Sequence, residues 1–339
     1  MKTCSTIEKI SRNLRHRIID KDAGRLLIAS LSGSEQEKDL SAPLNCDGFG
    51  RIRHFRRKST SGSSSWPPDP LPMDPVCKAF GLERVDIIRA QVFQIAACNF
   101  SCWYCFVPYD LISADLKHSG WLSPGTLVDR YLDQPDPPLV IDLSGGQPDL
   151  APEWVLLMMQ ALKDRGLDDS VYLWSDDNLS TDFFWRFLSE SDRDLIQSYR
   201  NYSRVCCFKG YSPQSFSFNT RRDEDLYRCQ FDMMRRLLTL KLDLYAYTTF
   251  TTHSCTDLRD EMKRFVDALQ SLDENLPLRT VPLEIIDFTP VKSRLTDETR
   301  LALKNQHIVI EYWNKELEDR FPAEQRNQNI ADVPLSGRK

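Results

Sequence analysis

Short apolar runs rich in β-branched and aromatic residues alternate along most of the chain with longer amphipathic stretches. Runs of this length and composition, bounded by glycine, proline and polar residues, are typical of buried strands. The sequence therefore predicts six strands. They lie within residues 86–97, 138–146, 170–177, 204–211, 242–252 and 282–291.

Helix signals occupy the stretches between these runs. Helices are expected to begin near Ser123-Pro124, Pro152, Thr181, Asp223 and Thr256, because such residues favour the first position or the N-cap of a helix. A last helix is expected over residues 297–320, after the sixth strand.

Strands that alternate with helices and are almost continuously apolar favour a parallel sheet covered by helices. Six such units predict an α/β fold, a six-unit partial TIM-like (β/α) barrel with parallel strands and an N-terminal extension. In folds of this kind the functional groups gather at the carboxyl ends of the strands.

Residues 59–75, STSGSSSWPPDPLPMDP, separate the extension from the predicted barrel. Their serine, glycine and proline content disfavours both helix and strand, so the segment is interpreted as a linker. The expected organisation is an extension over residues 1–80 that includes this linker, a core over 81–295, and a terminal helix with a flexible tail over 296–339.

Composition narrows the class of protein. The 339 residues carry a formal net charge of −5, and no apolar run approaches the about 20 residues that span a bilayer. We therefore expect a soluble cytoplasmic protein with no membrane partner. Ten cysteines, three of them clustered, fit a metal or catalytic role better than a disulfide framework.

The clustered cysteines are Cys98, Cys102 and Cys105, in the sequence CNFSCWYC just after the first predicted strand. Thiolates spaced C-x3-C-x2-C on a loop can converge on one iron-sulfur cluster. Three protein ligands would leave one iron of a four-iron cluster open.

This spacing, with the aromatic Tyr104 before the last cysteine, resembles the radical S-adenosylmethionine (SAM) superfamily. The resemblance implies one 4Fe-4S cluster held by Cys98, Cys102 and Cys105, whose open iron chelates SAM. It also implies reductive cleavage of SAM to methionine and a 5′-deoxyadenosyl radical, which removes a hydrogen atom from the substrate. Tyr104 would then lie along the adenine.

A second motif, Ser144-Gly145-Gly146-Gln147-Pro148, follows the second predicted strand. Two glycines let the backbone approach a ligand closely. In the family that it resembles, a Gly-Gly-Glu-Pro turn meets the methionine amino group, so Gly145, Gly146 and Gln147 would line the methionine. Gln147 replaces the usual glutamate and loses the charge assistance of a carboxylate.

Other polar residues at strand ends complete the predicted cofactor pocket. A hydroxyl or carboxylate from the Ser175-Asp176-Asp177 stretch would hold the ribose, with Ser175 and Asp177 as the chosen candidates, and Lys209 would suit the methionine carboxylate. The chemistry implies a one-electron donor such as flavodoxin or ferredoxin. The substrate, a protein, an RNA or a small metabolite, and the catalytic residues that act on it are not indicated by these motifs.

The competing interpretation is a non-enzymatic zinc-binding module that holds RNA through the basic run RIRHFRRK at residues 51–58. A structural zinc site requires four ligands, and the only C-x2-C pair in the sequence is Cys102 and Cys105. The same basic run would equally suit a phosphorylated substrate. Cys206 and Cys207 are adjacent on a predicted strand and are expected to be core residues on opposite faces.

Overall fold

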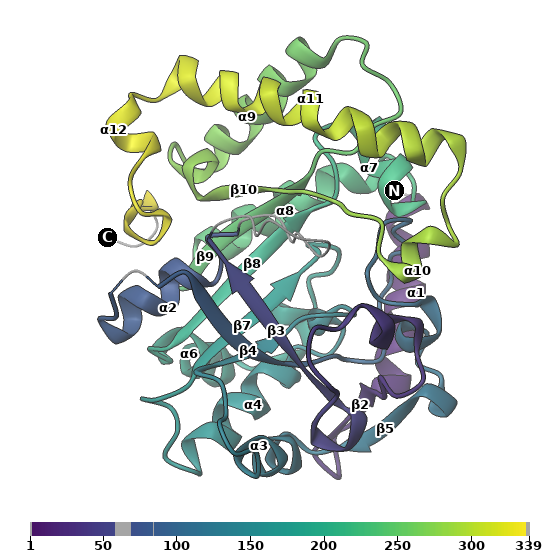
Figure 1. Cartoon of the computed structure of the whole chain (residues 1–339), viewed down its shortest axis with the longest axis vertical. Helices are drawn as coiled ribbons and strands as arrows, with labels where there is room; N and C mark the ends of the chain where they lie inside the picture. The colour runs from purple at the N-terminus through teal and green to yellow at the C-terminus, as the bar shows by residue number, and fades with distance from the viewer. Residues whose placement is uncertain (1, 58–68, 84, 337–339) are drawn as a thin grey trace.

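A curved seven-stranded sheet forms the centre of the computed structural model, which describes residues 2–57, 69–83 and 85–336 (Figure 1). The strand order is β10-β9-β8-β7-β6-β4-β3, and all neighbours except β3 and β4 pair in parallel. The six parallel strands confirm the predicted partial barrel. They are β4 (Ile87–Phe93), β6 (Val140–Leu143), β7 (Tyr172–Asp177), β8 (Tyr202–Phe208), β9 (Asp243–Thr249) and β10 (Thr280–Leu283).

Both faces of this sheet are buried, which explains the continuous apolar runs. Residues on the outer face, such as Leu173 and Cys206, belong to a large core shared with the helices. Residues on the inner face, such as Trp174 and Cys207, belong to a second core. The adjacent cysteines of β8 therefore point to opposite faces and are both buried, as predicted.

Helices cover the outer face of the sheet (Figure 1). Ser123 caps the first of them by accepting a hydrogen bond from the Thr126 amide, and a capping box of Thr296 and Thr299 begins the last. The predicted helix over residues 297–320 is confirmed. The helices are α3 (Pro124–Leu132), α4 (Glu153–Lys163), α5 (Phe183–Phe187), α6 (Glu190–Ser198), α7 (Pro213–Thr220), α8 (Leu226–Leu238), α9 (Leu258–Leu272) and α11 (Asp297–Arg320).

The N-terminal region contributes an edge strand to the central sheet. Strand β3 (Gly50–Arg56) pairs antiparallel with β4, and its dark purple arrow lies beside β4 in Figure 1. The rest of this region forms α1 (Lys2–Ile18), β1 (Ile19–Asp20) and β2 (Arg25–Ala29). Strand β2 also pairs with β5 (Ser119–Leu122) in a small antiparallel sheet. The basic run at 51–58 is thus largely a strand.

Helix α2 (Met73–Phe80) begins inside the segment that was predicted to be a linker. Its first turn buries Met73 and Val76 against the inner face of the sheet, and this burial outweighs the low helix propensity of the proline-rich sequence. The expectation that residues 59–75 contain no helix is therefore wrong for residues 73–75, while residues 59–68 lie outside the described part of the chain.

A segment near the C-terminus packs beside helix α2. The 3-10 turn Ile330–Asp332 packs against α2, where the Lys78 ammonium donates a hydrogen bond to the Ala331 carbonyl at 2.8 Å. The Arg279 Nε donates to the Val333 carbonyl at 2.7 Å. Residues of the predicted tail are therefore packed, with Leu335 only 4% exposed. Within the described ranges, no helix has the length and apolar character required to cross a membrane.

Candidate active site

The cysteine loop, residues 98–105, follows β4 at the carboxyl edge of the parallel sheet. Cys102 is buried, and Cys98 and Cys105 are partly exposed. The Cys98 amide donates a hydrogen bond to the Ile112 carbonyl at 2.9 Å, so the base of the loop is fixed. All three cysteines therefore sit where a parallel α/β fold presents its functional groups.

Three side chains from outside the loop hold its backbone. Arg222 donates from Nη2 to the Asn99 carbonyl at 2.6 Å, and Arg294 donates from Nη1 to the Cys105 carbonyl at 2.8 Å. The Tyr109 hydroxyl lies 3.0 Å from the Cys102 carbonyl oxygen, to which it donates. The loop conformation is thus set by contacts to carbonyl groups, which the sequence patterns did not indicate.

Asn219 on α7 joins the loop to two strand ends. Its Oδ1 accepts hydrogen bonds from Trp103 Nε1 at 3.2 Å and from Thr251 Oγ1 at 2.6 Å. Its Nδ2 donates to the Lys209 carbonyl at 2.9 Å. The Asn219 side chain is completely buried, and each of these partners depends on it. Sequence reasoning missed this residue, because a lone asparagine in a weakly amphipathic helix carries no signal.

The glycine turn, residues 144–147, packs against the chain that leads into the cysteine loop. Gly145 and Gly146 have φ angles of +90° and +73°, which glycine adopts without strain. A Cβ atom on Gly146 would clash with the Ile95 carbonyl oxygen and lie 2.7 Å from that of Ala97. The Gln147 amide donates to the Ala97 carbonyl at 2.7 Å. The glycine turn is therefore in direct contact with the residues that lead into Cys98.

The side chain of Gln147 is buried in a hydrogen-bond network. Its Oε1 accepts from the Asn178 amide at 2.9 Å, and its Nε2 donates to Asp177 Oδ1 at 2.9 Å. Asn178 in turn donates from Nδ2 to Asn99 Oδ1 at 3.0 Å and contacts Cys98 Sγ at 3.8 Å. Asn178 thus links the turn to the cysteine loop. The only sequence signal for it was its position directly after the polar end of β7.

Ser175 and Asp177 lie on the outer face of the sheet. The Ser175 hydroxyl hydrogen-bonds the Tyr202 hydroxyl at 2.8 Å, and Asp177 lies 3.5 Å from the Arg204 guanidinium. The structure therefore places both side chains among buried polar groups under the helices, and Asp177 reaches the predicted site through Gln147. Their assignment to the ribose stays a prediction.

Lys209 and Tyr104 lie on the inner side, close to the cysteines. Thr249 Oγ1 donates to the Tyr104 hydroxyl at 2.9 Å. Burial tends to lower the pKa of Lys209, but the neighbouring Cys207, Tyr104 and Cys102 groups together raise it well above its ordinary value. The structure thus gathers Lys209 and Tyr104 around Cys102, and Lys209 carries a positive charge there.

The surroundings of Cys98 and Cys102 favour the neutral thiol. Burial raises the pKa of Cys98 to about 11 and that of Cys102 to about 12, although the Lys209 charge acts to lower both. A bound metal overrides such a shift, because a coordinating thiol loses its proton outright.

The arrangement of ligands bears on which metal centre fits. Among the residues that the structure describes, no group of three or more histidine, cysteine or acidic side chains is placed to hold a single metal ion. A zinc site draws four ligands onto one ion, whereas a four-iron cluster gives each cysteine a separate iron and so spaces the sulfurs more widely. Three cysteine thiols on one loop are a donor set of the kind that holds an iron-sulfur cluster.

Comparisons with known proteins add distant likenesses of fold. No family model matches the sequence. No curated protein matches it either. Streptococcus suis SuiB bound to S-adenosylmethionine is similar in structure, with 14% identity and a TM-score of 0.43 over 66% of this chain and 46% of that one. SuiB bound to its precursor peptide SuiA gives 12% identity and a TM-score of 0.45, over 66% and 45%.

TYW1 with a lysine-pyruvate adduct bound is also similar in structure. It shares 13% identity with this chain at a TM-score of 0.45, over 72% of this chain and 77% of that one. The protein thus spans less than half the length of SuiB and about three quarters of TYW1.

Proposed function

We propose that this protein is a radical SAM enzyme. The observation that carries the proposal is the contact between the glycine turn and the chain that enters the cysteine loop, since the Gly146 backbone lies against the Ile95 and Ala97 carbonyls just before Cys98. A cysteine loop and a glycine turn, separated by about 40 residues in the sequence, meet at the carboxyl edge of a partial barrel. Neither a structural zinc site nor ordinary loop packing accounts for both.

The residues have separate roles in this proposal. Cys98, Cys102 and Cys105 hold the cluster, and Gly145 and Gly146 let the backbone approach the methionine part of SAM. Gln147 keeps one acceptor lone pair on Oε1 beyond its bond to Asn178, which suits an ammonium hydrogen. Tyr104 and Lys209 line the inner side, where Lys209 attracts the methionine carboxylate.

When bound, the reduced cluster supplies one electron that cleaves SAM to methionine and a 5′-deoxyadenosyl radical. The electron comes from outside the chain, from a donor such as flavodoxin or ferredoxin. That radical would take one hydrogen atom from the substrate. Trp103 and Tyr104, between the second and third cysteines, are buried and would shield this side of the site from solvent.

Electron paramagnetic resonance of anaerobically reconstituted protein tests the proposal. We expect about four irons per chain and a reduced-cluster signal that changes when SAM is added, since SAM binds the open iron. A colourless protein that takes up zinc stoichiometrically and no iron would refute it.

A pair of cysteine variants tests the ligand assignment. Cys102→Ala is expected to abolish the iron signal, whereas Cys255→Ala should leave it unchanged, because Cys255 is exposed and lies outside the cysteine loop. A Cys102→Ala protein that keeps a full cluster would show that another residue is the ligand. Equal iron loss in both variants would point to general damage instead.

A further inference from the structure

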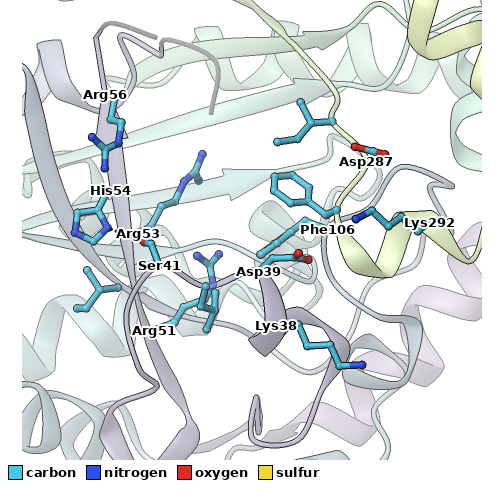
Figure 2. A pocket seen from close by; sticks show the side chains of 14 residues that line it. Lys38, Asp39, Ser41, Arg51, Arg53, His54, Arg56, Phe106, Asp287 and Lys292 are labelled. Carbon is cyan, nitrogen blue, oxygen red and sulfur yellow. Dashed lines mark hydrogen bonds between the residues drawn. The ribbon is translucent and has the colours of Figure 1, made fainter. Parts of the chain in front are cut away.

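A cavity of about 590 Å³ opens between β3 and the segment that follows β10. Figure 2 shows Arg51, Arg53 and Arg56 along β3, with Phe106, Asp287 and Lys292 across the cavity from them. One side is β3, an edge strand of the sheet. The other side is the segment that connects β10, the opposite edge strand, to α10 (Thr289–Lys292). The cavity therefore lies at the open side of the partial barrel.

Positive charge dominates the walls of this cavity. Lysine or arginine occurs at five lining positions, and two carboxylates oppose them. One of these, Asp39, is already engaged, because it accepts hydrogen bonds from the Thr289 amide at 2.7 Å and from the Thr289 hydroxyl at 2.8 Å. The five cations are Lys38, Arg51, Arg53, Arg56 and Lys292. A ligand that enters the cavity meets an excess of positive charge.

Arg51 is the strongest sign that a ligand is needed. The residue is only 6% exposed, and its Nε is buried without a hydrogen-bond partner. In the described ranges it forms no ion pair within 4.0 Å, whereas Arg53 on the same strand lies 3.6 Å from Asp142. Burial lowers the pKa of Arg51, and the charges of Asp142 and Asp176 only partly oppose this shift, so an anion in the cavity would supply the direct partner that the guanidinium lacks.

We infer that this cavity binds the phosphate group of a small organic substrate, an inference that rests on the proposed function. Arginine matches phosphate geometry with two parallel hydrogen bonds. The Phe106 and Phe288 rings, 4.6 Å apart, add an apolar wall for the organic part. The substrate is placed next to the cluster, because Phe106 directly follows Cys105 in the sequence.

The size of the cavity favours a small molecule over RNA. Its volume falls within the range of about 300 to 1,000 Å³ that is usual for small-molecule sites. A single-stranded RNA needs a groove that follows several nucleotides and offers successive stacking surfaces. The basic strand β3 instead faces a second wall of the protein.

Calorimetric titration of the full chain tests the inference. The probes are inorganic pyrophosphate, ribose 5-phosphate and, as the uncharged comparison, ribose. None contains adenine, so none competes for an adenosine site. We expect saturable binding of the two phosphates, weakened by salt, and no binding of ribose. Failure of both phosphates to bind would overturn the inference.

Two sets of variants locate the binding. Lys38→Gln/Lys292→Gln removes two exposed charges from the cavity rim and should weaken pyrophosphate binding about tenfold without disturbing the fold. Arg51→Lys keeps the charge but removes the paired N–H donors of the guanidinium, and should also weaken binding about tenfold. The matched control Lys163→Gln/Lys304→Gln removes two exposed charges that do not line the cavity, and should bind normally.

Iron content and SAM cleavage, measured on the same proteins, separate this inference from the proposed function. Loss of phosphate binding in the cavity variants, with both other properties retained, supports the inference. A wild-type protein that holds the cluster and cleaves SAM, but binds neither phosphate probe, overturns the inference and leaves the proposed function standing. Tighter binding of a single-stranded RNA than of pyrophosphate, lost in the same variants, would overturn the small-molecule assignment.

Discussion

Replacement of Asn219 by alanine is expected to destabilise the protein and its cysteine loop together. The substitution removes the acceptor of two buried hydrogen bonds, from Trp103 Nε1 and Thr251 Oγ1, and the donor of a third, to the Lys209 carbonyl. Each buried group left without a partner costs about 1–3 kcal/mol. Because water can enter part of the space that the side chain leaves, we expect the free energy of unfolding to fall by about 3–6 kcal/mol.

Urea denaturation of the metal-free protein, followed by circular dichroism, measures this loss without interference from a cofactor. Asn305→Ala is the matched control, since Asn305 is also buried and its Nδ2 donates to the Thr252 carbonyl at 3.0 Å. This control should lose only about 1–2 kcal/mol. Iron uptake by the two variants then reports on the loop, and only Asn219→Ala should take up less iron than the wild type.

Two results would refute this reasoning. A loss below about 1 kcal/mol for Asn219→Ala would mean that its three partners find other partners or solvent. Equal losses in the two asparagine variants would mean that the cost comes from the cavity alone and not from the hydrogen bonds. Normal iron uptake by a destabilised Asn219→Ala protein would separate the stability of the fold from the shape of the loop.

Further predictions concern the glycine turn and the buried charges on the outer face. Gly146→Ala should lower the free energy of unfolding by about 2 kcal/mol or more, because its Cβ would clash with the Ile95 carbonyl. Gly166→Ala, with a φ of +66° but open space around it, should cost about 1 kcal/mol, and equal costs would contradict the clash. Arg204→Met leaves Asp149, 2.8 Å away, and Asp177, 3.5 Å away, without their counter-charge and should cost about 3–5 kcal/mol by urea denaturation, a cost that adding Asp149→Asn should reduce. Burial raises the pKa of Asp149 to about 7 from 3.8, although Arg204 opposes the shift. The folded chain therefore binds more protons from about pH 4 to pH 7, and stability should fall as pH rises through this window. Asp149→Asn should reduce that slope without removing it, because burial also raises the pKa of Asp176 to about 7, and an unchanged slope would assign it to groups other than Asp149.

The parallel strands and the position of the cysteine loop could be predicted because each depends on local sequence. Both faces of β6 and β8 are buried, and apart from Asp142 and Arg204 most of their positions carry an apolar or small residue, so the runs are easily seen. The terminal helix α11 likewise has its own cap at Thr296. Such features depend on residues that are close in the sequence, so they can be recognised without knowledge of the tertiary contacts.

The edge strand β3 could not be predicted for a physical reason. Its sequence GRIRHFR looks like an exposed basic segment, yet Arg51 is buried and Arg53 faces Asp142 on a strand some 90 residues away in the sequence. The charge on this strand is compatible with a sheet only because of that distant carboxylate and the adjoining cavity. A pattern of single residues does not contain such a pairing.

Asn178 and Asn219 were missed for the same reason. Each has partners on several elements that are separated by up to 116 residues in the sequence. Their importance follows from the number of buried partners, which only the structure provides. The outward direction of Ser175 and Asp177 was not predicted, because side chains alternate between the two faces of β7 and only the structure shows which set points outward.

The way in which the cysteine loop is held has a consequence for how such chains diverge in evolution. Arg222, Tyr109 and Arg294 donate hydrogen bonds to backbone carbonyl oxygens, which every amino acid possesses. Related chains can therefore exchange the residues between the cysteines and still keep the same backbone path, provided that the three gripping side chains persist. A search for remote relatives should include the positions of these three side chains together with the three cysteines, because the sequence of the loop can change faster than its backbone conformation.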